Sequence, residues 1–241
     1  DLLIRNGLVE LFESFCKRRG GDLYAFLYRE CGLDEAQIAP AVRYQISTGE
    51  ALDAEHTLKD IHRFMRDAQG NAYIPGSSLK GALRTALLYQ MIAKEEPQRR
   101  QAAVSRFLEI PLDRRNEKYL GLPEANYLHV LGLDAQKPAN AVNSVMRGIQ
   151  VSDSEPIPDQ AITLVMKQDG STAGQVHTVN LCRECVAPGT QVPFRLTLDQ
   201  SILKNRITMQ SILSAINAFA AYYRQTYESH FARPYGTLDP G

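Results

Sequence analysis

The clearest pattern in the sequence is a stripe of apolar residues at helical spacing, which begins directly after a proline–glycine turn. Leu79, Leu83, Leu87 and Met91 recur every four residues, and this period places them on one face of an α-helix. The helix is expected to continue to Glu96 and to stop before the next proline. One long amphipathic helix therefore anchors whatever fold the chain adopts.

The other segments favour helices in the first half of the chain and short strands in the second. Residues 2–38 and 98–110 show helical spacing, whereas residues 41–47 alternate as in a strand. Four short β-like runs follow Gly148, and residues 57–66 suit a strand or a short helix; the runs are 149–151, 161–166, 176–179 and 192–198. Because these elements lack the regular rhythm of long βαβ units, the predicted fold class is α+β.

Residues 208–229 read as a final long helix. Its predicted apolar face consists of Ile212, Leu213, Ile216, Phe219 and Ala220, and three tyrosines follow, at positions 222, 223 and 227. A ladder of tyrosines can stack nucleobases. Here the tyrosines continue the apolar face, so packing against the core or a partner is the favoured interpretation.

The net charge argues against a free nucleic-acid-binding protein. The 241 residues include 27 basic and 27 acidic side chains, so the formal charge is zero, whereas phosphate contacts usually require an excess of positive charge. Neutrality is compatible with a subunit that offers one basic strip to RNA and other surfaces to protein neighbours. No apolar run is long enough to cross a bilayer and no signal peptide opens the chain, so we expect a cytoplasmic protein without a membrane partner.

The cysteine and histidine patterns give weak indications of chemistry. Cys182 and Cys185 have the spacing of a zinc or redox pair. A structural zinc site needs about four ligands, and no second such pair exists. Two reduced cysteines at a strand end are therefore favoured, with no metal and no cofactor. His129 and His177 lack an interpretable nucleophile or carboxylate, so neither is assigned to catalysis.

The turn before the long helix has the composition of a phosphate-binding segment. Pro75 fixes the approach of the chain, and Gly76 permits a sharp turn. Ser77 or Ser78 is expected to cap the helix. Free N–H groups and the positive end of the helix dipole would then suit a phosphate.

Two cations and a second glycine extend this segment along one helix face. Lys80 and Arg84 lie four residues apart, and Gly81 removes a side chain where a sugar–phosphate backbone would need room. The segment is not a nucleotide P-loop, because its lysine precedes the second glycine. The alternative is a capped helix with incidental surface charge.

A second candidate contact lies near residues 152–154, a Ser-Asp-Ser turn. This turn could bind RNA or a metal, but such turns more often satisfy their own backbone. Arg147, one short strand earlier, is the better candidate for a phosphate contact, with a surface ion pair as an equal alternative.

Residues 73–87 resemble the central motif of the RAMP (Cas7-like) superfamily, the RNA-binding subunits of CRISPR effector complexes. Within it, residues 147–154, 181–190 and 194–199 resemble stretches of the fifth subunit of type III-A Csm complexes. The likeness spans roughly residues 60–230. It implies an α+β fold of ferredoxin-like (RRM-like) modules with helical insertions, here an N-terminal RAMP module over 1–145 and a C-terminal ferredoxin-like module over 146–241.

The resemblance also implies a function. Such a subunit binds the crRNA near its 3′ end, caps the complex beside the adjacent backbone RAMP subunit, and takes part in crRNA 3′-end maturation for antiviral defence. It does so through recruited host nucleases, without nuclease activity of its own. The RNA-binding residues would be Gly76, Ser77, Ser78, Lys80, Gly81, Arg84 and Arg147.

The sequence departs from the family pattern at both ends. The usual first strand, with its Ser/Thr-x-x-His-x-Gly turn, is not found before residue 40, and the C-terminal glycine-rich loop is absent unless residues 235–236 belong to it. Two alternatives stay open. One is a backbone RAMP subunit that is a metal-dependent RNA endonuclease, with Asp53 and Asp60 as candidate aspartates; the other is a nucleotide-binding enzyme.

Overall fold

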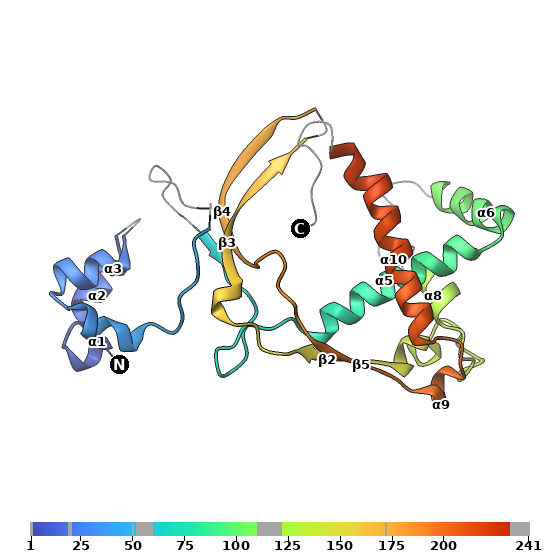
Figure 1. Cartoon of the computed structure of the whole chain (residues 1–241), viewed down its shortest axis with the longest axis horizontal. Helices are drawn as coiled ribbons and strands as arrows, with labels where there is room; N and C mark the ends of the chain where they lie inside the picture. The colour runs from blue at the N-terminus through green and yellow to red at the C-terminus, as the bar shows by residue number, and fades with distance from the viewer. Residues whose placement is uncertain are drawn as a thin grey trace. The chain divides into compact units, whose positions relative to one another are not determined.

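The computed structural model describes residues 2–18, 21–49, 51, 60–109, 122–171 and 173–231 (Figure 1). The chain forms two compact units, each assembled from discontinuous segments. The first contains residues 1–72, 156–169 and 176–190, and the second contains 73–155, 170–175 and 191–241. These units are defined by packing, so the predicted module boundary at residue 145 stays a prediction.

The first unit opens with short helices, as predicted for residues 2–38. They are α1 (Leu2–Arg5), α2 (Val9–Cys16), α3 (Leu23–Ala25), the π-helix η1 (Phe26–Glu30), α4 (Glu35–Ile38) and the 3-10 helix η2 (Ala39–Ala41). Phe26, Leu27, Leu33 and Ile38 are buried together. Asp34 caps α4 in a capping box, so side chains of the segment itself define where this helix begins.

The first unit also contains a small sheet in the order β1–β4–β3. Its strands are β1 (Asp60–His62), β3 (Ile162–Gly170), which follows the 3-10 helix η6 (Asp159–Ala161), and β4 (Val176–Val186). β1 runs parallel to β4, with Ile61 opposite Cys182. The connection between β3 and β4 is short, so these neighbours form a hairpin. Leu164 and Cys182 lie in the buried core of the sheet.

The strand expected over residues 41–47 is wrong. Only Ser47 joins a ladder, as an isolated parallel bridge to Thr163, and residues 42–46 lie outside regular structure. The alternation instead reflects side-chain packing, since Ile46 packs on the sheet core and the ring of Tyr44 lies against the guanidinium of Arg66. Of residues 57–66, β1 covers 60–62, and residues 52–59 lie outside the described part of the chain.

The second unit is built around α5 (Gly76–Lys94). Its other elements are α6 (Pro97–Leu108), α8 (Leu122–Leu128), η4 (Ala141–Asn143), η5 (Val145–Gly148), β2 (Ile149–Ser154), β5 (Phe194–Leu198), α9 (Gln200–Leu203), α10 (Met209–Tyr223) and the π-helix η7 (Arg224–Glu228). β2 and β5 pair antiparallel. α5 packs against β2 and α10, and Leu83, Leu87, Ile149 and Ile212 lie in the shared core. The α+β class is confirmed.

The final helix forms as predicted, but only part of its predicted apolar face, Ile212 and Phe219, packs on the core. A capping box of Thr208 and Ser211 starts α10, and Ile212 is buried. Leu213 and Ile216 are 48% and 37% exposed, because about 3.6 residues per turn place them one step around the helix. The three tyrosines at positions 222, 223 and 227 are 46%, 41% and 55% exposed, so they are not core residues. Among the described helices, none is long and apolar enough to cross a membrane.

Candidate nucleic-acid interface

A carboxylate from another strand caps the N-terminus of α5. The helix begins at Gly76, and Pro75 occupies the N-cap position without a side-chain hydrogen bond. The backbone N–H of Gly76 donates to Asp153 Oδ1 at 2.7 Å. The prediction that Ser77 or Ser78 caps the helix is therefore wrong, because both serines already lie in the first turn, where they are exposed.

Gly76 is required by a close approach between α5 and β2. A Cβ at this position would lie 2.5 Å from the carbonyl oxygen of Val151 and 2.7 Å from that of Ser152. Its φ is not positive, so a sharp turn is not the reason for the glycine. The sequence analysis thus singled out Gly76 correctly, but the reason for the glycine is close packing and not a sharp turn.

Residues 152–154, expected to form a turn, are instead the last residues of β2, and their side chains bind the backbone of neighbouring segments. Ser152 Oγ accepts the N–H of Arg195 at 2.9 Å, and Ser154 Oγ accepts the N–H of Ile74 at 2.9 Å. With Asp153 on Gly76, all three side chains satisfy main-chain groups. The expectation that these side chains satisfy backbone groups is met, both locally, where the two serine hydroxyls donate to the next carbonyl oxygen, and in other segments.

The exposed face of α5 carries small and polar residues. Ser77, Ser78, Arg84 and Thr85 are exposed on this face. A Cβ added at Gly81 would meet no atom within 4 Å. Glycine inside a helix costs about 0.5–1 kcal/mol relative to alanine, and the packing of this unit does not require it. The open surface at Gly81 therefore leaves room for a ligand.

The cations of the motif are only lightly engaged. Arg84 Nη1 lies 3.5 Å from Glu124 Oε2, and both side chains are partly exposed, so the pair contributes little to stability. Lys80 is half-buried at the edge of the exposed face and forms no ion pair with the described residues. Both groups are available to an anionic partner that approaches α5 from the side.

Arg147 lies in η5, just before β2, and belongs to the same unit. It is exposed, and its Nη1 donates to the carbonyl oxygen of Val142 at 3.0 Å. The expected alternative, a surface ion pair, is not formed with any described residue. One edge of its guanidinium is therefore fixed to the backbone.

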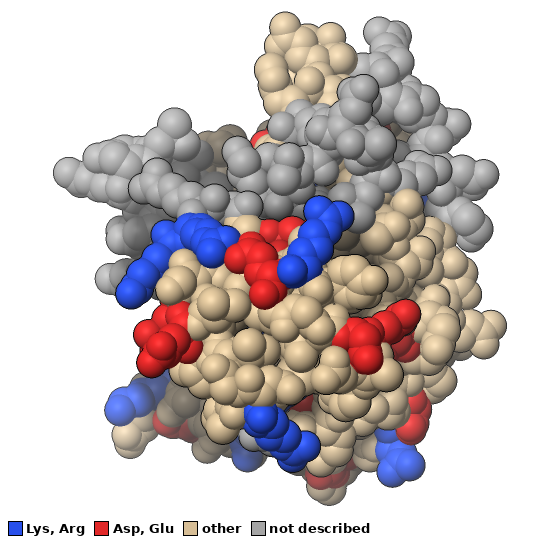
Figure 2. Space-filling model, turned by 90° about the vertical axis from the view of Figure 1, so that its left-hand side faces the viewer, with Lys and Arg blue, Asp and Glu red and all other residues tan. Residues whose placement is uncertain are grey.

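The face of the molecule on the side of the N-terminal helices carries mixed charge. Figure 2 shows lysine and arginine side chains interspersed with aspartate and glutamate among uncharged residues. The described residues on this face thus form no continuous basic band. Positive and negative side chains are therefore mixed on this face, in keeping with the neutral overall charge.

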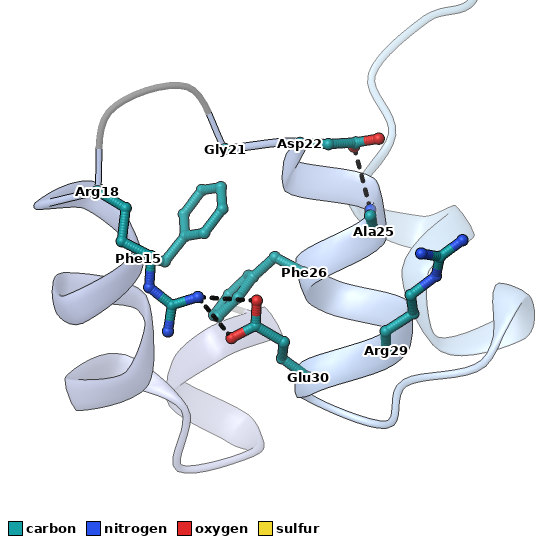
Figure 3. A pocket seen from close by; sticks show the side chains of 8 residues that line it. All are labelled: Phe15, Arg18, Gly21, Asp22, Ala25, Phe26, Arg29 and Glu30. Carbon is teal, nitrogen blue, oxygen red and sulfur yellow. Dashed lines mark hydrogen bonds and ion pairs between the residues drawn. The ribbon is translucent and has the colours of Figure 1, made fainter.

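A surface pocket lies among the N-terminal helices (Figure 3). It is lined by Phe15, Arg18, Gly21, Asp22, Ala25, Phe26, Arg29 and Glu30. The rings of Phe15 and Phe26 stack with centroids 4.4 Å apart. Arg18 donates to both oxygens of Glu30 at 2.9 Å, and Arg29 points away from the rings (Figure 3). The arginine beside the rings is thus already paired with a carboxylate.

The cysteine pair is separated by the geometry of its strand. Cys182 is buried within β4 and Cys185 is partly buried, and both are free thiols. Side chains three residues apart on a strand point to opposite faces, so these two cannot share a metal. The prediction of a strand end is wrong for Cys182, which lies inside the strand.

The candidate aspartates show no metal site in the described part of the chain. Asp60 is exposed at the first position of β1, and Asp53 lies outside the described residues. Within the described ranges, no group of three or more His, Cys, Asp or Glu side chains is placed to hold a metal ion. The endonuclease alternative thus gains no support from these residues.

The cap on α5 gives a direct stability test. Asp153→Ala should lower the free energy of unfolding by about 1 kcal/mol, the usual cost of losing an N-cap, whereas Asp153→Asn keeps an acceptor and should cost less. Ser77→Ala is the matched control and should be nearly neutral, because Ser77 makes no cap. Urea denaturation measures all three. A cost for Ser77→Ala equal to that of Asp153→Ala would contradict this assignment.

This geometry defines a class of α+β protein. In it, a helix whose exposed face carries small and polar residues packs on a two-stranded sheet. A family model described as the RAMP superfamily matches residues 2–224. The chain therefore belongs to the RAMP superfamily, and the resemblance predicted from residues 73–87 is confirmed.

The chain is also similar to individual members of this superfamily. CRISPR system Cms protein Csm5 of Mycobacterium tuberculosis is 31% identical over 147 residues, which are 60% of this chain and 37% of that protein. The Streptococcus thermophilus protein of the same name is 32% identical over 142 residues, 58% of this chain and 34% of that protein. The matched part thus spans less than two fifths of the length of these relatives. The crystal structure of T. onnurineus Csm5 shares the fold, with a TM-score of 0.58, 18% identity, and coverage of 95% of this chain and 70% of that one.

Proposed function

We propose that this chain is a subunit of a type III-A CRISPR effector complex that binds the crRNA near its 3′ end and caps the complex. The observation that carries the proposal is the exposed face of α5, where a glycine that packing does not require lies between Lys80 and Arg84. Membership of the RAMP superfamily and the similarity to proteins named Csm5 support it.

We infer from the geometry of α5 that RNA would bind along the side of the helix. The N–H of Gly76 is already bonded to the carboxylate of Asp153, which disfavours a phosphate end-on at the helix N-terminus. The RNA backbone would instead lie across the side of the helix at Gly81, within reach of Lys80, Arg84 and the serine hydroxyls. Such contacts position the RNA without reading its bases.

We further propose that the subunit is not itself a nuclease. It would contact the adjacent backbone RAMP subunit and take part in crRNA 3′-end maturation through recruited nucleases. In the assembled complex, Asp53→Ala combined with Asp60→Ala should leave periodic cleavage of a complementary target RNA unchanged. Loss of that cleavage, in a complex that still contains the subunit, would favour the endonuclease alternative.

Removing the two cations of α5 should weaken RNA binding and reduce its salt dependence. For single-stranded RNA, each phosphate that a cation neutralises contributes about 0.7 to the slope of log K against log salt. Lys80→Ala with Arg84→Ala should therefore lower the magnitude of this slope by about 1.4. Fluorescence anisotropy over a series of salt concentrations gives the slope.

The control is a variant of equal charge away from this face. Lys94 and Arg99 are exposed beyond the α5 motif, so Lys94→Ala with Arg99→Ala removes the same net charge and should leave the slope nearly unchanged. An equal drop in both double variants would mean that bulk charge, and not the α5 face, determines binding. An unchanged slope in the first variant would exclude this helix face as the contact.

A further inference from the structure

A second apolar stripe runs along α10 and its continuation η7. It consists of Met209, Leu213, Ile216, Ala220, Tyr223 and Tyr227, whose spacing alternates strictly between four and three residues. All six are exposed, the five large side chains by 37% to 55%. The fifteen residues of α10 include no charged side chain. A helix with this composition is expected to be covered on more than one side.

One side of α10 is already covered by α5. Ile212 and Ala215 are buried there, Ser214 accepts a hydrogen bond from Gln90 at 3.0 Å, and the ring of Phe219 lies 5.6 Å from that of Tyr89. The six-residue stripe lies one step around the helix from this buried side. Packing against α5 therefore does not account for it.

The C-terminal end of the stripe is an ordered aromatic surface. Tyr223 and Tyr227 stack with ring centroids 4.9 Å apart and an interplanar angle of 28°, and the ring of Phe231 follows at 5.5 Å. The π-helical turn η7 begins directly after Tyr223. Single π-turns within α-helices are rare and frequently occur at functional sites, so this end of the helix has two unusual features together.

We propose that this stripe is the docking surface for an amphipathic α-helix of a neighbouring protein subunit, an inference that rests on the proposed function. Alternating four- and three-residue spacing is the pattern by which one helix packs along another. From Met209 to Tyr227 the stripe is about 27 Å long at the usual helical rise, enough for a partner helix of about five turns. Ala220, in its middle, allows the two helices to approach closely.

The charges favour a protein helix over RNA. RNA binding depends on cations that neutralise phosphates, and α10 offers none. Arg224, which follows it, is half of an i,i+4 pair with Glu228 at 4.0 Å. The partner should accordingly present uncharged, apolar side chains at heptad spacing, with polar groups only near the tyrosine hydroxyls.

Site-specific photo-crosslinking in the assembled complex identifies the occupant. With p-benzoylphenylalanine at position 213 of the full chain, in a reconstituted complex that contains crRNA, we expect crosslinks to a peptide of a neighbouring subunit with apolar residues at heptad spacing. Crosslinks to the crRNA, to a second copy of this chain or to the same molecule would each overturn the proposal. So would the absence of any crosslink in a complex that retains the subunit.

A charge-substitution pair measures the contribution of the stripe to assembly. Leu213→Glu with Ile216→Glu should reduce incorporation of the subunit at least about tenfold, because two apolar side chains no longer pack against the partner. Gln210→Glu with Ala221→Glu adds the same charge on an exposed part of α10 away from the stripe and should incorporate normally. Equal incorporation of both double variants would overturn the proposal.

RNA binding by the isolated chain separates this inference from the proposed function. The stripe variant should keep its helical circular dichroism and bind RNA with an unchanged salt slope, since α5 is untouched. If the Lys80 and Arg84 variant leaves RNA binding intact while the stripe variant still fails to assemble, the RNA proposal is lost and the docking surface stands. If the stripe variant loses helicity, its failure to assemble is not informative, and the crosslinking result then tests the docking surface.

Discussion

Replacing Glu184 by alanine should lower the free energy of unfolding by about 3–5 kcal/mol, the usual cost of removing one partner from a buried charge cluster. Glu184 is buried in β4. Its Oε1 accepts the hydroxyl of Tyr44 at 2.7 Å, and its Oε2 accepts the N–H of Phe64 at 2.9 Å. The carboxylate thus joins three segments that are distant in the sequence.

The same substitution would remove one of the negative charges that stabilise the buried guanidinium of Arg66. Arg66 Nη1 donates to Asp159 at 2.7 Å, its Nη2 lies 3.9 Å from Glu184, and its guanidinium lies 3.5 Å from the ring centre of Tyr44. Burial opposes the charge of Arg66, but the hydrogen bond and charge of Asp159 raise its pKa above the usual value. Burial and the bond to Glu184 also raise the pKa of the Tyr44 hydroxyl.

Two controls make the test specific to the buried cluster. Glu184→Gln keeps an acceptor of nearly the same shape and should cost less than Glu184→Ala. Glu30→Ala breaks the exposed Arg18–Glu30 pair and should cost about 0–1 kcal/mol. Urea denaturation followed by circular dichroism compares the variants. If Glu184→Ala and Glu30→Ala had equal effects, the buried cluster would not stabilise the fold.

Alanine at Gly76 and at Gly81 should change stability in opposite directions. Gly76→Ala places a methyl group 2.5 Å from a carbonyl oxygen of β2 and should cost about 1–3 kcal/mol, as overpacking usually does. Gly81→Ala projects into open space and should stabilise the helix by about 0.5–1 kcal/mol. The two variants have the same chemistry on the same helix, so each is the control for the other in thermal or urea unfolding.

RNA binding adds a second readout for Gly81. If the sugar–phosphate backbone crosses α5 at this residue, Gly81→Ala should bind RNA more weakly even though it is more stable. A variant that is both more stable and fully competent to bind RNA would show that the glycine is not a contact point. The added methyl group is thus expected to raise stability and to weaken RNA binding.

Local patterns allow the helices to be predicted, because periodicity is a property of neighbouring residues. Apolar spacing alone is enough to locate α5 and α10. It does not reveal the cap of α5, since Asp153 lies 77 residues from Gly76, and nothing local to Ser77 excludes it as the cap. An Asp flanked by two serines at the end of a predicted strand is the one signal in the sequence that suggests this contact.

Predictions that depend on tertiary packing are less successful. The alternation over residues 41–47 predicts a strand, although Tyr44 points to a cluster with Glu184, 140 residues away. The spacing also assigns Leu213 to the buried face of the last helix. Apolar residues form two adjacent rows along this helix, and the sequence does not show which row faces the core. The only hint of the buried cluster in the local sequence is Glu184 itself. It is a charged residue in a strand that also contains buried apolar residues.

The bond between Asp153 and the first amide of α5 also bears on competition by small anions. A helix N-terminus attracts phosphate and nucleotides, which surround any protein in the cell at far higher concentrations than one particular RNA. Here that position is filled by the protein's own carboxylate. A small anion at the end of α5 meets a carboxylate already bonded to the first amide, whereas a long polyanion can engage several side chains along the helix at once. The built-in carboxylate would therefore favour polymers over monomers without any contact to a base.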